Sequence, residues 1–256
     1  MANHYRSTEQ MVIRCAKELI DGEVVFAGVG LPLLVVCFAM MTHARHITLL
    51  TEGGSVRGTA PPGLAITVDD PVLFASGDAT FGMTGAMAAL QRGEVDLTFI
   101  SGAQIDRLGN INSTGVGNWE KPRTFTYFAG SGGANDMATS GKRGLIIIPQ
   151  DPKKFVERVD YLTSPGFIGG AGHREALGML GGGPAVVVST MGVYRFDAQS
   201  REMYLAEYFS GQSVEKVRSF CSFDLKVSRD VKETESPTEE ELTLLRELDP
   251  KGFYLS

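Results

Sequence analysis

The stretch that decides the fold is Val24-Val25-Phe26-Ala27-Gly28-Val29-Gly30-Leu31-Pro32. Its first four residues are apolar, and their number suits a short buried strand. Gly28 and Gly30 allow the backbone to turn sharply, and Pro32 is a residue that the first turn of a helix favours. The stretch therefore predicts a strand, a tight turn and an apolar helix that begins near Leu31, which is the basic step of an α/β fold.

The rest of the chain repeats this alternation of short apolar segments and helices. Strands are predicted at residues 47–51, 97–100, 124–128 and 145–148, and antiparallel strands or a strand with a hairpin at residues 186–189, 192–196 and 203–208. Capping signals and helical spacing predict a helix from Ser7, a helix over residues 83–91 and a last helix capped by Ser236-Pro237-Thr238-Glu239. Such an order predicts an open, mostly parallel α/β sheet with flanking helices.

Between the predicted elements, no repeat or linker divides the chain. Residues 55–77 are rich in Gly, Pro and Asp and are predicted to form a long irregular loop. Because no low-complexity tract interrupts the sequence either, residues 1–256 are predicted to form a single domain.

The composition limits the classes of partner and compartment. The chain has 256 residues, of which 43% are hydrophobic and 21% charged, an ordinary balance for a globular protein. A formal net charge of −6 gives no electrostatic attraction to nucleic acid or anionic membrane. The longest apolar run, residues 31–41, is far short of the ~20 residues that span a bilayer. We expect a cytoplasmic protein whose three cysteines, Cys15, Cys37 and Cys221, are reduced thiols.

Glycine clusters follow three of the predicted strands. Ligands of open α/β sheets bind at the carboxyl ends of strands, and the clusters at residues 28–30, 53–54 and 130–133 lie at such ends. Glu52 stands directly after a five-residue apolar strand and is followed by Gly53 and Gly54, which we expect to leave room for a bulky reactant. The alternative is that Glu52 caps the next turn or pairs with an arginine.

Other templates for a binding site fit less well. Gly28-x-Gly30, with an acid about 20 residues later, is similar to a dinucleotide fingerprint, but Leu33 replaces its third glycine. The glycine cluster at residues 130–133 is not a nucleophile elbow, because Ala129 stands where the first glycine belongs. The four histidines lack the spacing of metal ligands, so no metal site is expected.

Taken together, these segments resemble the β subunits of family I coenzyme A transferases. Gly28-Val29-Gly30-Leu31-Pro32 resembles the Gly-x-Gly-[Ile/Leu]-Pro turn of that family, and Glu52 stands where the family carries its catalytic glutamate. Residues 102–114, 130–136 and 159–166 are similar to the β subunit of glutaconate CoA-transferase. The matches occur in family order from about residue 8 to residue 250.

The resemblance implies a reaction and a set of site residues. Glu52 would attack an acyl-CoA and form a covalent glutamyl-CoA thioester, from which CoA passes to a carboxylic acid acceptor of the glutaconate type. The backbone N–H groups of Val29 and Gly133 would stabilise the oxyanions. Contacts with substrate or CoA are expected from Gly28, Gly30, Gln104, Gly132 and Asn135. For Gln104 and Asn135, the alternative role is to hold loops by hydrogen bonds to the backbone.

The family also implies a partner and leaves two further functions open. A homologous α subunit would complete a hetero-oligomer, and a coenzyme A thioester would be the substrate without any permanently bound cofactor. The departure from the family pattern is Gly53-Gly54, where Asn-Gly or Ser-Gly is commoner. Relatives without the glutamate act as decarboxylases or as hydrolases of CoA thioesters, and a silent CoA-binding subunit is another alternative. Because Glu52 is retained, transfer is favoured.

Overall fold

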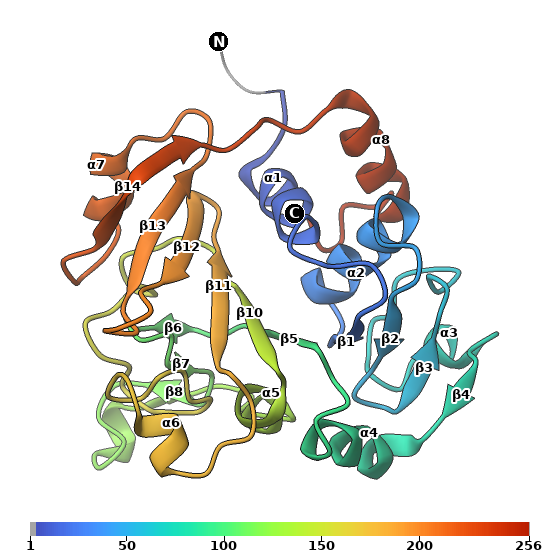
Figure 1. Ribbon diagram of the computed structural model, residues 1–256, viewed down its shortest axis with the longest axis horizontal. Helices are drawn as coiled ribbons and strands as arrows, with labels where there is room; N and C mark the ends of the chain where they lie inside the picture. Colours follow the sequence, from blue (N-terminus) through green and yellow to red (C-terminus); the bar gives the residue numbers. More distant parts are fainter. Residues whose placement is uncertain (1–3, 256) are drawn as a thin grey trace. The chain divides into compact units, whose positions relative to one another are not determined.

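The computed structural model describes residues 4–255, which form two compact units (Figure 1). The first unit comprises residues 4–99 and 236–255, and the second comprises residues 100–235. The prediction that the whole chain is one domain stays a prediction. In the described part of the chain, no helix is long and apolar enough to cross a bilayer.

The first unit is built on a sheet whose strands lie in the order β5-β1-β2-β3-β4. β1 is parallel to β2 and to β5, whereas β3 and β4 are antiparallel to their neighbours. The strands are β1 (Val24–Phe26), β2 (Thr48–Leu50), β3 (Ser55–Arg57), β4 (Ala79–Thr80) and β5 (Leu97–Ile100). The helices are α1 (Ser7–Ala16), α2 (Leu31–Met41), α3 (Pro71–Phe74), α4 (Gly82–Gln91) and α8 (Glu239–Leu248).

The core of the first unit follows from the apolar pattern of its helices. α2 is apolar all round, and eight of its eleven residues are buried. α1 and α8 are amphipathic and pack against α2 and each other, with Met11 and Cys15 of α1 and Leu242 of α8 buried. A capping box opens α8 close to the predicted cap at residues 236–239, but Thr238 and Glu241 exchange its hydrogen bonds, in place of Ser236 and Glu239.

The second unit has a sheet of order β14-β13-β12-β11-β10. β10 is parallel to β11, β11 to β13 form an antiparallel meander, and β14 is parallel to β13. These strands are β10 (Arg143–Ile147), β11 (Pro184–Val188), β12 (Gly192–Phe196), β13 (Met203–Tyr208) and β14 (Lys226–Glu233).

Shorter elements complete the second unit. Two hairpin sheets pair β6 with β7 and β8 with β9. The short strands are β6 (Gln104–Ile105), β7 (Ile111–Asn112), β8 (Gly115–Val116) and β9 (Thr126–Tyr127). The helices are η1 (Pro122–Thr124), α5 (Ala134–Ser140), α6 (His173–Ala176) and α7 (Val214–Ser219).

The predicted class, an open and mostly parallel α/β sheet with flanking helices, is confirmed, whereas two local predictions are wrong and one strand was not predicted. Residues 55–77 are not wholly irregular, since they contain β3 and α3. Residues 124–128 give only the two-residue strand β9, which pairs with β8 outside the larger sheet. β14 was not predicted, because its exposed and charged residues carry no apolar run. All three cysteines are free thiols, as predicted, with Cys221 half-buried and the other two buried.

A buried arginine fixes the loops of the second unit. Arg174 is 3% exposed. Within residues 4–255, every hydrogen bond found for its guanidinium is donated to a backbone carbonyl. Two of the acceptors, Ala138 and Thr139, lie in the last turn of α5, where a cation is favourable. Others are Pro165, Gly166 and Gly181. Burial lowers the pKa of Arg174. The guanidinium therefore joins α5 to two loops.

We expect Arg174→Met to lower the free energy of unfolding by about 2–4 kcal/mol, because several buried carbonyls would lose their donors. Urea denaturation of the purified chain, followed by circular dichroism, measures the change. Arg229→Met on β14 is the matched control, since Arg229 is exposed, and it should change stability by less than about 0.5 kcal/mol. Equal midpoints for the two variants would contradict the role given to Arg174.

Candidate active site

Glu52 lies in the tight turn that links β2 to β3. The N–H of Gly54 donates to the carbonyl of Thr51 at 2.9 Å, and the N–H of Thr51 donates to the carbonyl of Ser55 at 3.0 Å. Thr51 is buried, whereas Glu52 is half-buried. These bonds hold the backbone of Glu52 just beyond the carboxyl end of a parallel strand, which is where α/β sheets bind ligands.

The glycine turn after β1 lies beside the Glu52 turn. β1 and β2 are parallel with Phe26 opposite Leu50, and the N–H of Ala27 donates to the carbonyl of Leu50 at 3.1 Å. Gly28, Val29 and Thr51 line one narrow crevice that is too small to hold a water molecule. Gly30 has φ +91° and is the N-cap of α2, so a side chain there would be strained. The structure thus brings residues 28–30 and Glu52 to one edge of the sheet.

The expectation that Gly53 and Gly54 leave room for a reactant is wrong. A Cβ at Gly53 would lie 2.6 Å from the carbonyl oxygen of Val68, and one at Gly54 would lie 2.4 Å from the backbone of Gly82. The N–H of Phe81 also donates to the carbonyl of Gly54 at 2.8 Å. The protein's own backbone therefore fills that space, which explains why Gly53 stands where the family pattern has the larger Asn or Ser.

Arg57 is a part of this site that the sequence analysis missed. It is 1% exposed and donates to the carbonyls of Thr59, Leu73 and Ala75 at 3.1, 3.0 and 2.6 Å. The guanidinium thereby holds the segment that contains α3 and that packs on Gly53. The sequence did carry a signal for this role of Arg57. It is the one basic residue between residues 51 and 91, and it follows the glutamate by five positions.

In the second unit, the glycine cluster at residues 130–133 forms a turn before α5. Gly130 and Gly132 have φ of +91° and +49°, and the buried Gly133 is the N-cap of α5. The N–H of Gly130 donates to the carbonyl of Ser113 at 3.1 Å, and the hydroxyl of Ser113 donates back to the carbonyl of Gly130 at 3.0 Å. The turn is therefore tied to the segment after β7. The roles of Val29 and Gly133 as oxyanion donors stay predictions.

Gln104 and Asn135 both make contacts that hold a loop. The buried amide oxygen of Gln104 accepts from Asn112 at 2.7 Å and from the N–H of Asp160 at 3.0 Å. The amide nitrogen of Asn135 donates to the carbonyl of Thr163 at 3.3 Å. These bonds support the loop-holding role for both residues, and their contact with substrate stays a prediction. Gln104, Gly132, Gly133 and Asn135 belong to the second unit, and Glu52 belongs to the first.

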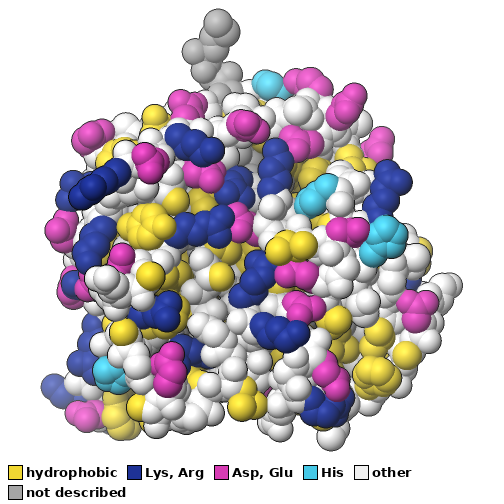
Figure 2. Space-filling model, viewed as in Figure 1, with side chains coloured by type: hydrophobic (Ala, Val, Ile, Leu, Met, Phe, Trp, Pro, Cys, Tyr) yellow, Lys and Arg dark blue, Asp and Glu magenta, His cyan; other side chains and the backbone are white. Residues whose placement is uncertain are grey.

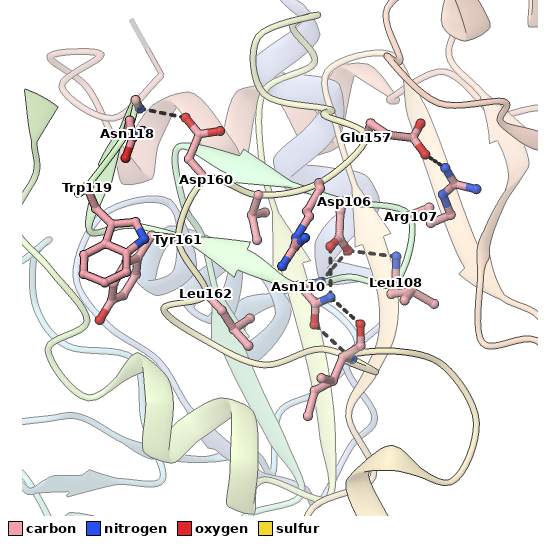
Figure 3. Close-up of a pocket in the computed structure, with 14 residues that line it drawn as sticks. Asp106, Arg107, Leu108, Asn110, Asn118, Trp119, Glu157, Asp160, Tyr161 and Leu162 are labelled. Carbon is pink, nitrogen blue, oxygen red and sulfur yellow. Dashed lines mark hydrogen bonds and ion pairs between the residues drawn. The ribbon is translucent and has the colours of Figure 1, made fainter. Parts of the chain in front are cut away.

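A large cavity of about 1280 Å³ lies elsewhere in the second unit (Figure 3). Asp106 accepts hydrogen bonds from Asn110 and from the N–H of Leu108, each at 2.9 Å, while burial raises the pKa of its carboxyl. Arg107 is paired with Glu157. These polar groups bind one another and shape the loops around the cavity. Within residues 4–255, none of the predicted site residues lines it.

Charged side chains do not form a continuous basic patch on the face shown in Figure 2, where acidic and basic groups are interspersed. Lys226 pairs with Glu202 at 2.6 Å, and an exposed pair of this type contributes little to stability. Arg246 pairs at 2.7 Å with Glu9, whose carboxylate is buried.

We expect Gly54→Ala to destabilise the first unit by about 2–3 kcal/mol, because a Cβ would meet Gly82 and φ is +87°. The shift of the urea midpoint measures the effect. Gly58→Ala is the matched control in the following segment, since a Cβ there would come only within 3.4 Å of the Asp78 carboxylate. A Gly54→Ala variant as stable as the control would show that the turn is not confined as described.

Comparison with known proteins agrees with this geometry. A family model described as "Coenzyme A transferase" matches residues 8–219. The β subunit of glutaconate CoA-transferase from Acidaminococcus fermentans is 36% identical over 259 residues, which cover 98% of this chain and 96% of the relative. The crystal structure of glutaconate CoA-transferase from the same organism matches with a TM-score of 0.91 at 33% identity, covering 99% of this chain and 98% of that chain.

Two further relatives show how far the likeness extends. The β subunit of 3-oxoadipate CoA-transferase from Pseudomonas knackmussii is 34% identical over 249 residues, which cover 96% of this chain and 94% of the relative. The decarboxylase AibA/AibB has a TM-score of 0.81 at 24% identity, covering 97% of this chain and 96% of that chain, and shares the fold alone. The family match and the two relatives above 30% identity are decisive: this chain belongs to the coenzyme A transferase family.

Proposed function

We propose that this chain is the β subunit of a CoA-transferase in which Glu52 is the covalent nucleophile. The observation that supports the proposal best is the position of Glu52, held in a tight turn at the end of β2 beside the glycine turn that follows β1. Membership of the coenzyme A transferase family gives the reaction class.

The transfer has two halves, formation of the Glu52–CoA thioester and its breakdown by the second acid, and each half takes two displacements at a carbonyl carbon. A carboxylate oxygen of Glu52 attacks the thioester carbonyl, the C–S bond breaks, and an acyl–glutamyl anhydride and CoA thiolate result. The thiolate then attacks the glutamyl carbonyl, the C–O bond of the anhydride breaks, and the first acid leaves as its carboxylate. A second acid reverses these steps from the Glu52–CoA thioester. Each oxyanion needs N–H donors worth about 3–4 kcal/mol apiece, for which Val29 and Gly133 are the candidates.

The proposal includes a second polypeptide and two candidate acids. The relatives from Acidaminococcus fermentans and Pseudomonas knackmussii are each named as one subunit of a larger enzyme, so a homologous α subunit is the proposed partner. Obligate interfaces of this kind bury more than about 2,000 Å². Glutaconate and 3-oxoadipate, the acids in those names, are dicarboxylic acids and are the first to be tested.

We expect Glu52→Gln and Glu52→Asp to reduce transfer by at least about 100-fold, because the first removes the anionic nucleophile and the second displaces it by about 1 Å. The complex with the α subunit should also accumulate a CoA adduct on the peptide that contains Glu52 when acyl-CoA is supplied without an acceptor. Mass spectrometry detects the adduct. Glu120→Gln, at an exposed position of the second unit, is the matched control and should keep both the rate and the adduct.

The outcomes of this experiment separate the alternative reactions. Turnover without any adduct, with partial activity in Glu52→Asp, would mean that Glu52 acts as a general base in a hydrolase. Release of carbon dioxide without an acceptor acid would mean a decarboxylase. Either result would replace the covalent transfer mechanism.

We expect the chain alone to have no transferase activity and to gain it on addition of the α subunit. Activity should rise with added α subunit and saturate at one α chain for each β chain, and analytical ultracentrifugation of the mixture should show the complex. Full activity of the purified chain by itself would remove the partner from the proposal.

A further inference from the structure

Residues 249–255, hereafter the strap, follow α8 in the first unit and are folded onto one carboxylate. Asp249 is 5% exposed. Its carboxylate accepts hydrogen bonds at 2.8, 2.8 and 3.1 Å from the N–H groups of Phe253, Tyr254 and Leu255. The carbonyl of the buried Leu255 in turn accepts a hydrogen bond from the hydroxyl of Thr8 in α1 at 3.1 Å. The strap is therefore held at both of its ends.

Tyr254 of the strap contacts two segments that lie beside the proposed nucleophile. Its hydroxyl donates a hydrogen bond to the carbonyl of Ala65, a buried residue between β3 and α3. Its ring lies against Gly30, where a Cβ would come within 3.8 Å of the ring carbon Cε1. Burial, together with nearby carboxylates, raises the pKa of the phenol, so the hydroxyl keeps its proton at neutral pH. One side chain thus joins the segment before α3 to the glycine turn after β1.

The hydrogen bond at Ala65 reaches the proposed nucleophile through one closed turn. The carboxylate of Asp70 accepts from two N–H groups of that turn, those of Ile66 at 3.1 Å and Val72 at 3.0 Å. Val68 lies inside the turn, and its carbonyl oxygen packs on the glycine that directly follows the nucleophile. Because the turn is closed, a shift of Ala65 would also shift the backbone that confines the nucleophile.

The contact at Gly30 acts on the proposed oxyanion donor. Gly30 directly follows Val29, whose N–H is the candidate donor in the first unit. Val29, Thr51 and Val68 line the same narrow crevice, so the glycine turn, the end of β2 and the turn before α3 pack closely together. Tyr254 therefore supports the nucleophile and the candidate donor of one unit from a single position.

We infer that Tyr254 is a positioning residue for the covalent step, and that the strap holds it in place. The inference rests on the proposed function, because it concerns the alignment of Glu52 with the N–H of Val29. It adds to the site a segment that lies beyond residues 8–219, the part of the chain that the family model matches.

The rate and the yield of the Glu52–CoA thioester test this role in the complex with the α subunit. The substrate is glutaconyl-CoA or 3-oxoadipyl-CoA, whichever the wild type converts faster, supplied without an acceptor. In Tyr254→Ala the rate constant at saturating substrate should fall about 10- to 100-fold, because a displacement of ~1 Å can have such an effect. The yield for each β chain and the half-saturating concentration should stay within about twofold. A residue that only stabilises the fold would lower the yield instead.

Two further variants separate the ring, the hydroxyl and the strap. Tyr254→Phe keeps the ring against Gly30 and removes the bond to Ala65, so the rate constant should fall only about threefold to tenfold. Asp249→Ala frees the strap and should slow thioester formation as Tyr254→Ala does. The double variant Asp249→Ala/Tyr254→Ala should lie within about threefold of the slower single variant, because changes within one coupled unit are not additive.

Hydrogen exchange of the same complex measures the support without relying on catalysis. Peptides from residues 24–34 and 62–74 should exchange at least about threefold faster in Tyr254→Ala, because their backbone would open more readily. Tyr5→Ala is the matched control, since Tyr5 belongs to the same unit and its hydroxyl donates to Ser236 at 3.0 Å. It should leave the exchange of both peptides and the rate constant within about twofold.

The outcomes distinguish this inference from the function on which it rests. A wild-type rate constant in Tyr254→Ala overturns the inference, as does a loss confined to the yield. Equal losses in Tyr5→Ala, or losses that multiply in the double variant, also overturn it. If the wild-type complex forms no thioester with either substrate, the proposed function fails. Unchanged exchange in Tyr254→Ala would then overturn the positioning role as well.

Discussion

The carbonyl oxygen of Val68 and the backbone of Gly82 lie against the turn that carries Glu52, at distances that a Cβ atom could not tolerate. This close approach of three backbone segments sets the position of the proposed nucleophile. The turn cannot shift toward either segment, and its own hydrogen bonds to Thr51 and Ser55 fix it to the end of β2. A nucleophile whose backbone is held in this way needs little backbone reorganisation before it attacks a thioester.

Each unit uses a buried arginine for the same physical purpose. Arg57 donates to Leu73 and Ala75 at the end of α3, and Arg174 donates to Ala138 and Thr139 at the end of α5. The last carbonyls of a helix have no partner within it and carry partial negative charge. A buried guanidinium with several donors can satisfy them together. In the first unit the held segment packs on the Glu52 turn, and in the second the held helix is capped by Gly133, so both arginines support the backbone next to predicted site residues.

The sequence predicted those parts of the fold that carry an apolar pattern. The strand–glycine–helix step at residues 24–41 and the strand before Glu52 follow from runs of buried residues, and parallel pairing then brings their ends together. β14 and β9 were missed or misplaced, because strands with charged or exposed residues leave no such pattern. The parts contributed by Arg57 and Val68 could not be predicted either, since they depend on contacts between segments that only the folded chain brings together.

The filled space beside Gly53 and Gly54 also bears on how the enzyme could be engineered or could diverge. The segment from residue 58 to residue 82 supports the nucleophile with its main chain and presents Ile66 and Phe81 to solvent with its side chains. Substitutions of those exposed side chains leave the support intact, whereas an insertion or deletion in the segment would move the support itself. Libraries that keep the length of this segment and vary its outward residues should therefore retain reactivity while they explore new acids.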